Sequence, residues 1–111
     1  MVVPNRHLST IGGLSEDELF DVMRLTKDAE AALSEAYRPD GINVGINLGR
    51  AAGAGIVHHL HVHLVPRWSG DTNFMSAIGE VRVLPEDLMA TRGRLRPIFE
   101  RLKADWSTAS R

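Results

Sequence analysis

The chain has no cysteine among its 111 residues, so neither a disulfide nor a thiolate metal site can form. It also lacks any apolar run approaching the ~18–20 residues that span a bilayer, and residues 1–7 lack the pattern of a secretory signal. The net charge is −1 without a basic block, which disfavours a nucleic-acid binder because such proteins concentrate lysine and arginine on one face. We therefore expect a cytoplasmic, single-domain protein that contacts neither membrane nor nucleic acid.

Histidine, in contrast, is concentrated in one short stretch: four of the five histidines lie within His58–His63, and three of them alternate with apolar residues. Because successive side chains of a strand point to opposite faces, His59, His61 and His63 would share one face while the residues between them point into a core. We call these three residues the histidine row. The stretch predicts a strand that carries this row and ends at Pro66.

The segment before this strand predicts a long helix and a partner strand. Ser15 with Glu18 three residues later forms a capping-box signature, and turn residues after Tyr37 end the helix. The apolar stripe of this helix, at the 3.6-residue period, consists of Leu19, Val22, Met23, Thr26, Ala29 and Leu33. Residues 42–48 alternate apolar and polar, which predicts a strand whose inward side chains are Ile42, Val44, Ile46 and Leu48.

A glycine-rich loop over residues 49–55 joins this strand to the histidine strand, so we expect the two strands to pair as an antiparallel hairpin. Pro85 at a first helical position opens a carboxy-terminal helix that Pro97 should kink or divide. The apolar stripe of this helix is Leu88, Leu95, Ile98, Phe99 and Leu102. The fold class expected from these elements is α+β, an antiparallel sheet with one long helix and a C-terminal helix.

Three interpretations of the histidine row are open. A structural role suits a lone histidine, but three on one face beside a glycine-rich loop are harder to explain in that way. A zinc site is the second interpretation, since histidine is a common zinc ligand. Successive same-face positions lie about 6.6 Å apart, which is too far for all three rings to reach one ion easily. The nearest carboxylate in the sequence is Asp71.

The third interpretation is nucleophilic catalysis at His61. A neutral imidazole can attack and form a covalent intermediate near pH 7 when a hydrogen-bond acceptor holds its second nitrogen. The glycine-rich loop offers backbone N–H groups, which commonly cradle phosphate oxygens, and Asn43 and Asn47 can add amide donors. This combination indicates phosphoryl chemistry that needs no metal, because the ring attacks directly.

The stretch His59–Val65 resembles the motif His-φ-His-φ-His-φ-φ, with φ an apolar residue, that names the histidine triad (HIT) superfamily of nucleotide hydrolases and transferases. Asn43–Gly55, Pro66–Met75 and Val2–His7 extend the resemblance towards the branch of actinobacterial diadenosine tetraphosphate phosphorylases. The resemblance implies a single HIT-like domain over residues 1–111, without the roughly forty or more residues that build the first strands of the family. It also implies a homodimer with one continuous sheet.

The resemblance implies a role for each matching residue. His61 would attack the α-phosphate and become a nucleotidyl-histidine, His63 would contact the phosphate or the departing group, and His59 would orient His61 by hydrogen bonding. Gly55–Val57 departs from the family pattern, because many members carry a polar pair there that donates to the leaving group. The residues expected to contact the substrate phosphates are Asn47, Ala54, Gly55 and Trp68.

The function implied is nucleotidyl transfer or hydrolysis on dinucleoside polyphosphates or related nucleotide phosphates, with phosphate or water as the acceptor. No cofactor is expected, and a divalent metal would enter only as a counter-ion of the substrate. Two alternatives remain: a HIT-fold module that binds nucleotide with weak or no turnover, and a zinc-binding domain.

Overall fold

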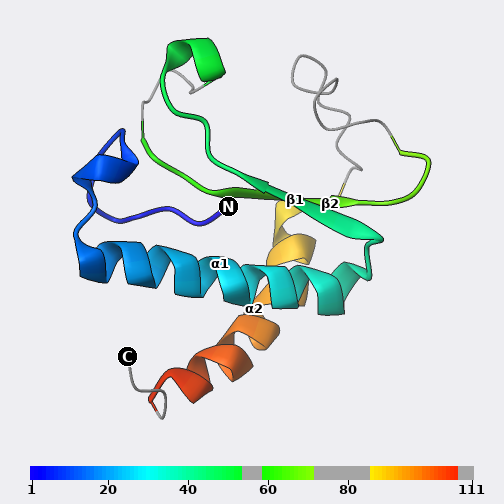
Figure 1. The fold of residues 1–111 in the computed structure, drawn as a ribbon. Helices are drawn as coiled ribbons and strands as arrows, with labels where there is room; N and C mark the ends of the chain where they lie inside the picture. The colour runs from blue at the N-terminus through cyan, green and yellow to red at the C-terminus, as the bar shows by residue number, and fades with distance from the viewer. Residues whose placement is uncertain (54–58, 72–85, 108–111) are drawn as a thin grey trace.

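Figure 1 shows the fold of the chain in a computed structural model, which describes residues 1–53, 59–71 and 86–107. Within these residues the helices are α1, Glu16–Tyr37, and α2, Leu88–Ala104, and the strands are β1, Gly41–Gly45, and β2, His63–Arg67. Short 3-10 helices are η1, Ile11–Gly13, η2, Arg50–Ala52, and η4, Asp105–Ser107. The α+β class expected from the sequence is confirmed.

The helix α1 begins and ends where its sequence predicts. The Ser15 hydroxyl accepts a hydrogen bond from the Glu18 N–H at 3.1 Å, and the Glu18 carboxylate accepts one from the Ser15 N–H at 2.9 Å, which completes the capping box. Arg6 binds the same carboxylate at 2.7 Å and ties the amino-terminal segment to the first turn. After Tyr37 the chain leaves the helix at Arg38, whose left-handed backbone (φ 48°) breaks the helical repeat.

The face that α1 buries is narrower than its apolar pattern. Val22, Thr26 and Ala29 are buried, and the Thr26 hydroxyl donates to the Val22 carbonyl at 2.7 Å. Leu19 and Met23, predicted in the same stripe, are 44% and 57% exposed. That part of the prediction is wrong because periodicity shows which side of a helix is apolar, whereas burial depends on how much of that side the small sheet covers.

The strands β1 and β2 pair antiparallel over their full length, with Gly45 opposite His63, as the hairpin pattern predicts. We keep the name histidine strand for residues 59–67, of which only His63–Arg67 form the regular strand β2. On its other edge, Val62 forms a bridge with Val2 through two backbone hydrogen bonds, at 2.8 and 2.9 Å. The histidine strand therefore lies between β1 and the amino-terminal segment of the chain.

The strand β2 continues through Pro66 to Arg67 instead of ending at Pro66. In an antiparallel strand the N–H groups of successive residues point to opposite edges, and the N–H of Val62 points away from β1 towards Val2. Pro66, four residues later, has the same parity, so its missing N–H faces the edge away from β1 and removes no hydrogen bond between the two strands. The prediction that this proline ends the strand is therefore wrong.

The core lies between the sheet and the helices. Its buried members are Val2, Val22, Ala29 and Val62, and the partly buried side chains packed against them are Leu25, Ile46, Leu64 and Phe99. Val44 and Leu48, predicted to point inward with Ile46, are 52% and 43% exposed. The segment before β2 pairs with Val2 at Val62, whereas β1 pairs only with β2 among the described residues. Its inward side chains therefore lie at the margin of the core, which is why this part of the prediction is wrong.

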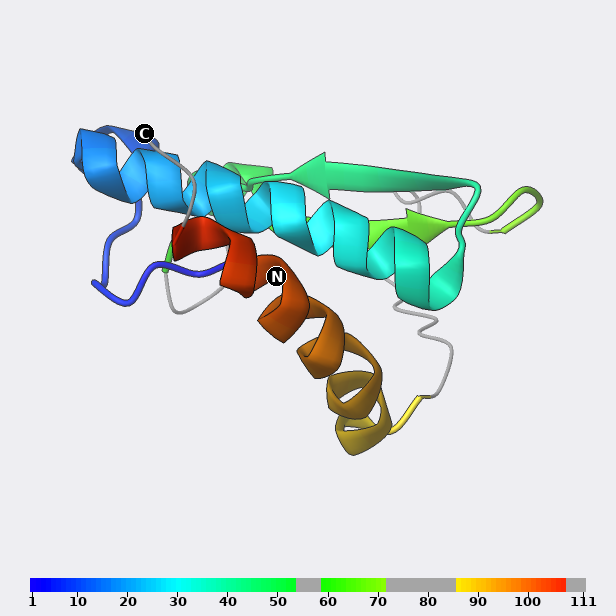
Figure 2. The same cartoon turned by 90° about the horizontal axis from the view of Figure 1, so that it is seen from below.

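The helix α2 begins at Leu88, and the Asp87 side chain caps it by accepting from the Met89 N–H at 3.0 Å. Pro85, predicted to open this helix, lies outside the described residues, and Pro97 lies inside α2 without dividing it. Leu88 is 84% exposed, against prediction, because the first turns of α2 extend away from α1 (Figure 2). The half-buried members of the predicted stripe are Leu95, Ile98, Phe99 and Leu102.

Both helices lie on the same side of the sheet, as the view from below in Figure 2 shows. The opposite face of the sheet therefore carries neither α1 nor α2, and the short helix η2 lies on that side (Figure 1). None of the helices in this part of the chain has both the length and the apolar content of a membrane span.

Candidate active site

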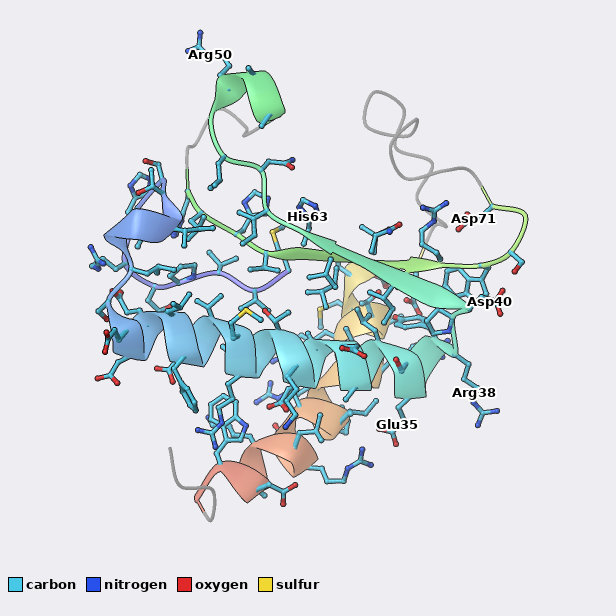
Figure 3. The ribbon with its side chains drawn as sticks, viewed as in Figure 1. Glu35, Arg38, Asp40, Arg50, His63 and Asp71 are labelled. Carbon is cyan, nitrogen blue, oxygen red and sulfur yellow. The ribbon has the colours of Figure 1, made fainter. Side chains whose placement is uncertain are left out.

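The histidine row stands on the face of the sheet that these helices leave uncovered. Leu60 and Val62, which alternate with the row, are each 3% exposed and belong to the buried interior, whereas His59, His61 and His63 are half-buried. Figure 3 shows the labelled third histidine of the row on the side of the sheet away from α1. The alternation that the sequence predicts is therefore confirmed, and the three imidazoles line one partly accessible face.

The ring of His61 is held by the main chain of its own strand. Its Nδ1 lies 3.0 Å from the carbonyl oxygen of His59. A carbonyl oxygen only accepts hydrogen bonds, so Nδ1 must carry the proton and donate it. In the neutral ring the other nitrogen, Nε2, then bears the lone pair. This arrangement presents Nε2 as a candidate nucleophile in the tautomer that covalent catalysis requires.

The ring of His59 is tied to the amino-terminal segment, not to His61. Its Nε2 lies 2.9 Å from the carbonyl oxygen of Pro4. Because a carbonyl oxygen only accepts hydrogen bonds, Nε2 carries the proton and donates it. The exposed imidazole of His7 packs at a tilt against it, with ring centroids 5.0 Å apart. His59 thus contacts His61 by a hydrogen bond to its backbone carbonyl, not through its ring. Sequence reasoning misses His7, because 51 further residues separate it from the row and no spacing rule joins them.

His63 lies 6.1 Å from His61 between ring centroids, with the two planes inclined at 57°. Burial lowers the pKa of His63 below its ordinary value of 6.5, and electrostatic interaction with His61 and with the chain's amino terminus lowers it further. The ring is therefore mostly neutral at pH 7. A neutral imidazole has one donor and one acceptor nitrogen, so His63 can both give and take a hydrogen bond beside His61.

Asn47 lies where β1 leads into the glycine-rich loop. Gly49 and Gly53 bracket η2 with φ values of 81° and 91°, which glycine adopts without steric strain. The side-chain nitrogen of Asn47 lies 3.5 Å from the point where a Cβ on Gly53 would stand, so this amide faces the loop. The β1–β2 register, continued by two residues, would place Asn47 opposite His61. The other predicted phosphate contacts in this loop lie outside the described residues and are Ala54 and Gly55.

Trp68 lies apart from the histidine row, beyond the other end of β2. It lines a shallow hollow of about 400 Å³ together with Asn43, Arg67 and Asp71, and Figure 3 shows the last of these well away from His63. The Arg67 guanidinium donates to Asn43 Oδ1 at 2.7 Å and pairs with Asp71 at 2.7 Å, which lowers the pKa of the Asp71 carboxyl. Trp68 is five positions after His63, a distance of about 16 Å along an extended chain. The structure therefore does not bring this tryptophan to the row.

A metal site would need at least three convergent ligands. Among residues 1–53, 59–71 and 86–107, no three histidine, aspartate or glutamate side chains are grouped in this way. The zinc interpretation of the histidine row therefore has no ligand set within this part of the chain.

Known proteins resemble this chain in sequence. The family model described as the HIT domain matches residues 1–70. The AP-4-A phosphorylase of Mycobacterium tuberculosis is 46% identical over 92 residues, which cover 83% of this chain and 47% of that protein. The bis(5'-adenosyl)-triphosphatase of Dictyostelium discoideum is 28% identical over 110 residues, which cover 93% of this chain and 72% of that protein. The chain thus spans about half the length of the mycobacterial relative.

The architecture agrees with a solved structure. A hypothetical histidine triad nucleotide-binding protein from Sulfolobus tokodaii superposes with a TM-score of 0.70 at 24% identity, covering 93% of this chain and 70% of that one. At this level of identity the likeness concerns the fold alone. The family match, in contrast, covers more than half of the sequence and includes the whole histidine row. The chain therefore belongs to the HIT family, as its histidine motif predicts.

Proposed function

We propose that this chain transfers or hydrolyses nucleotidyl groups of dinucleoside polyphosphates or related nucleotide phosphates through a covalent intermediate on His61. The observation that carries the proposal is the hydrogen bond from His61 Nδ1 to the His59 carbonyl, which makes the Nε2 lone pair available for attack. The names of the two relatives, a phosphorylase of AP-4-A and a bis(5'-adenosyl)-triphosphatase, support the substrate class.

In the first proposed step, His61 Nε2 attacks the α-phosphorus and forms a P–N bond. The P–O bond to the departing phosphate chain breaks, and its electron pair leaves on that oxygen. The ring becomes positively charged, and the His59 carbonyl, which accepts from Nδ1–H, stabilises that charge. In the second step an oxygen of water or inorganic phosphate attacks the same phosphorus and gives up its proton to solvent. The P–N bond breaks and its electron pair returns to Nε2.

The other residues of the proposed site support these steps. His63, which is mostly neutral at pH 7, would donate a hydrogen bond to the departing phosphate oxygen. The Asn47 amide and the backbone N–H groups of Ala54 and Gly55 would bind phosphate oxygens. Trp68 would contact a part of the substrate remote from the attacked phosphorus, since it lines the hollow at the other end of β2. A divalent metal would serve only as a counter-ion of the substrate phosphates.

The alternative function is nucleotide binding with weak or no turnover. One observation favours it: Gly55–Val57 replaces the polar pair of many family members. A homodimer, which the resemblance to the family implies, stays a prediction for either function.

Mass spectrometry after incubation with diadenosine tetraphosphate tests the proposal. We expect an AMP-sized addition that mild acid removes, as a P–N bond to histidine requires, and peptide mapping should place it within residues 59–63. His61→Ala should abolish the addition. His7→Ala is the matched control, because it removes an imidazole that packs on His59 and should leave the addition intact.

An addition that persists in His61→Ala would refute the choice of nucleophile. If the unsubstituted chain gains no mass but melts at a higher temperature with AMP present, the binding function is correct instead. Far-UV circular dichroism of His61→Ala must match that of the unsubstituted chain, so that loss of the addition cannot be attributed to unfolding.

A further inference from the structure

The ring of His63 occupies the space that a side chain at residue 45 would take. Gly45 is the strand partner of His63, so the two residues share one face of the sheet. A Cβ built on Gly45 would stand 2.9 Å from His63 Nε2 and 3.6 Å from each of the two ring carbons that flank this nitrogen. The equal distances show that the Nε2 corner of the ring points at the missing side chain. The imidazole therefore leans across the hairpin onto the backbone of β1.

The backbone of β1 does not itself require glycine at this position. The φ angle of Gly45 is not positive, so any residue could adopt the backbone conformation at this position. Gly41, on the same strand and the same face, has no described atom within 4 Å of its own Cβ position. Glycine inside a strand weakens the strand, and it often marks a close approach of other atoms to the backbone. At Gly45 that approaching group is the imidazole of His63.

We propose that Gly45 is a positioning residue for His63: its lack of a side chain lets the third imidazole of the row lean over β1 and sets the place of that ring relative to His61. The effect on turnover rests on the proposed function, whereas the placement of the ring does not.

The substitution Gly45→Ala should move the ring without unfolding the chain. Ordinary contact with a Cβ begins near 3.4 Å, so Nε2 must retreat by about 0.5 Å. The obstructing atom is the tip of a side chain that can rotate, so the strand need not shift. A ring that moves away from β1 gains contact with water, and the pKa of His63 should rise towards 6.5. The other groups that lower the pKa of His63, namely His61 and the amino terminus, remain in the variant, and Gly45 contributes no charge from β1.

Proton–nitrogen NMR of the imidazoles in the full chain tests the placement. The variants are Gly45→Ala and its matched control Gly41→Ala, and the spectrum of His63→Gln assigns the resonances of His63. We expect Gly45→Ala to shift the His63 resonances and raise the pKa of His63, while Gly41→Ala leaves both unchanged. Unchanged resonances and pKa of His63 in Gly45→Ala, or equal changes in the two alanine variants, would overturn the proposal.

Turnover of diadenosine tetraphosphate tests the consequence. Gly45→Ala should lower kcat on the order of tenfold or more, since a misplacement of about 1 Å can reduce rates about a hundredfold. In the His63→Gln background the same substitution should cause no further loss, because the group that it displaces is gone. A full additional loss there, or an unchanged kcat in Gly45→Ala, would refute the functional role. No turnover in the unsubstituted chain would refute the proposed function instead, and the NMR result would still decide the placement.

Discussion

Replacement of Val62 by alanine should destabilise the chain far more than the same replacement at Val44. Both valines lie on the core side of the sheet, but Val62 is 3% exposed and Val44 is 52% exposed. Val44 faces Leu64 across the hairpin, at the margin of the core. Each buried methyl or methylene group removed loses about 0.8 kcal/mol of transfer free energy, and an unfilled cavity adds to the loss. We therefore expect the free energy of unfolding to fall by about 2–3 kcal/mol for Val62→Ala and by less than about 1 kcal/mol for Val44→Ala.

Urea unfolding followed by far-UV circular dichroism measures both changes. In a domain of about 100 residues, 1 kcal/mol corresponds to a shift of roughly 4–8 °C in Tm, so Val62→Ala should melt at least about 8 °C below the unsubstituted chain. Val62 lies in the strand between His61 and His63. The variant therefore also tests whether packing of Val62 in the core holds the strand that carries the histidine row. Equal losses at the two valines would refute the assignment of the buried and exposed positions of the sheet.

Two further predictions concern pH. Hydrogen bonds from the Arg6 side chain and from Ser15 lower the pKa of the Glu18 carboxyl from 4.5 to about 2, so its contribution to stability is present above pH 4.5 and is lost as the pH falls towards 2. Acid unfolding should be less steep in that range for Glu18→Gln, and an identical acid profile would contradict the contact. Burial lowers the folded pKa of His63 below 6.5, so the unfolded chain takes up this proton more readily and stability should rise as the pH rises towards 6.5. Urea unfolding in a series of buffers should show a smaller rise for His63→Gln, and an equal rise would count against the shift.

Features that depend on near neighbours in the chain can be predicted from the sequence. The capping box needs only Ser15 and Glu18 at a spacing of three, and the structure forms it. The histidines of the row and the apolar residues between them point to opposite faces. This follows from the two-residue period of a strand and does not depend on what packs around the strand. The family motif can be recognised for the same reason, because it is written in consecutive residues.

Exposure is less predictable, because it depends on which elements cover a side chain. Met23, Val44 and Leu88 are as apolar as their buried neighbours, yet each is more than half exposed. Their positions fit the helical or strand period, but no neighbouring element covers them enough to bury them. Periodicity therefore predicts the direction of a side chain more reliably than its burial.

The chemical state of each histidine depends on contacts that no spacing rule contains. His61 donates to a backbone carbonyl of its own strand, the ring of His59 finds its acceptor 55 residues away on the amino-terminal segment, and the ring of His63 fits where its strand partner has no side chain. The first two partners are main-chain carbonyls, which every residue carries, and the glycine opposite His63 can be related to that ring only once the strand register is known. The strand period brings three imidazoles to one face, and the surrounding backbone gives each ring a different hydrogen bond or packing contact. The resemblance to the family already implies the middle histidine as the candidate nucleophile, whereas the hydrogen bond that fixes the tautomer of its ring, from Nδ1 to the His59 carbonyl, is a contact that the motif does not contain.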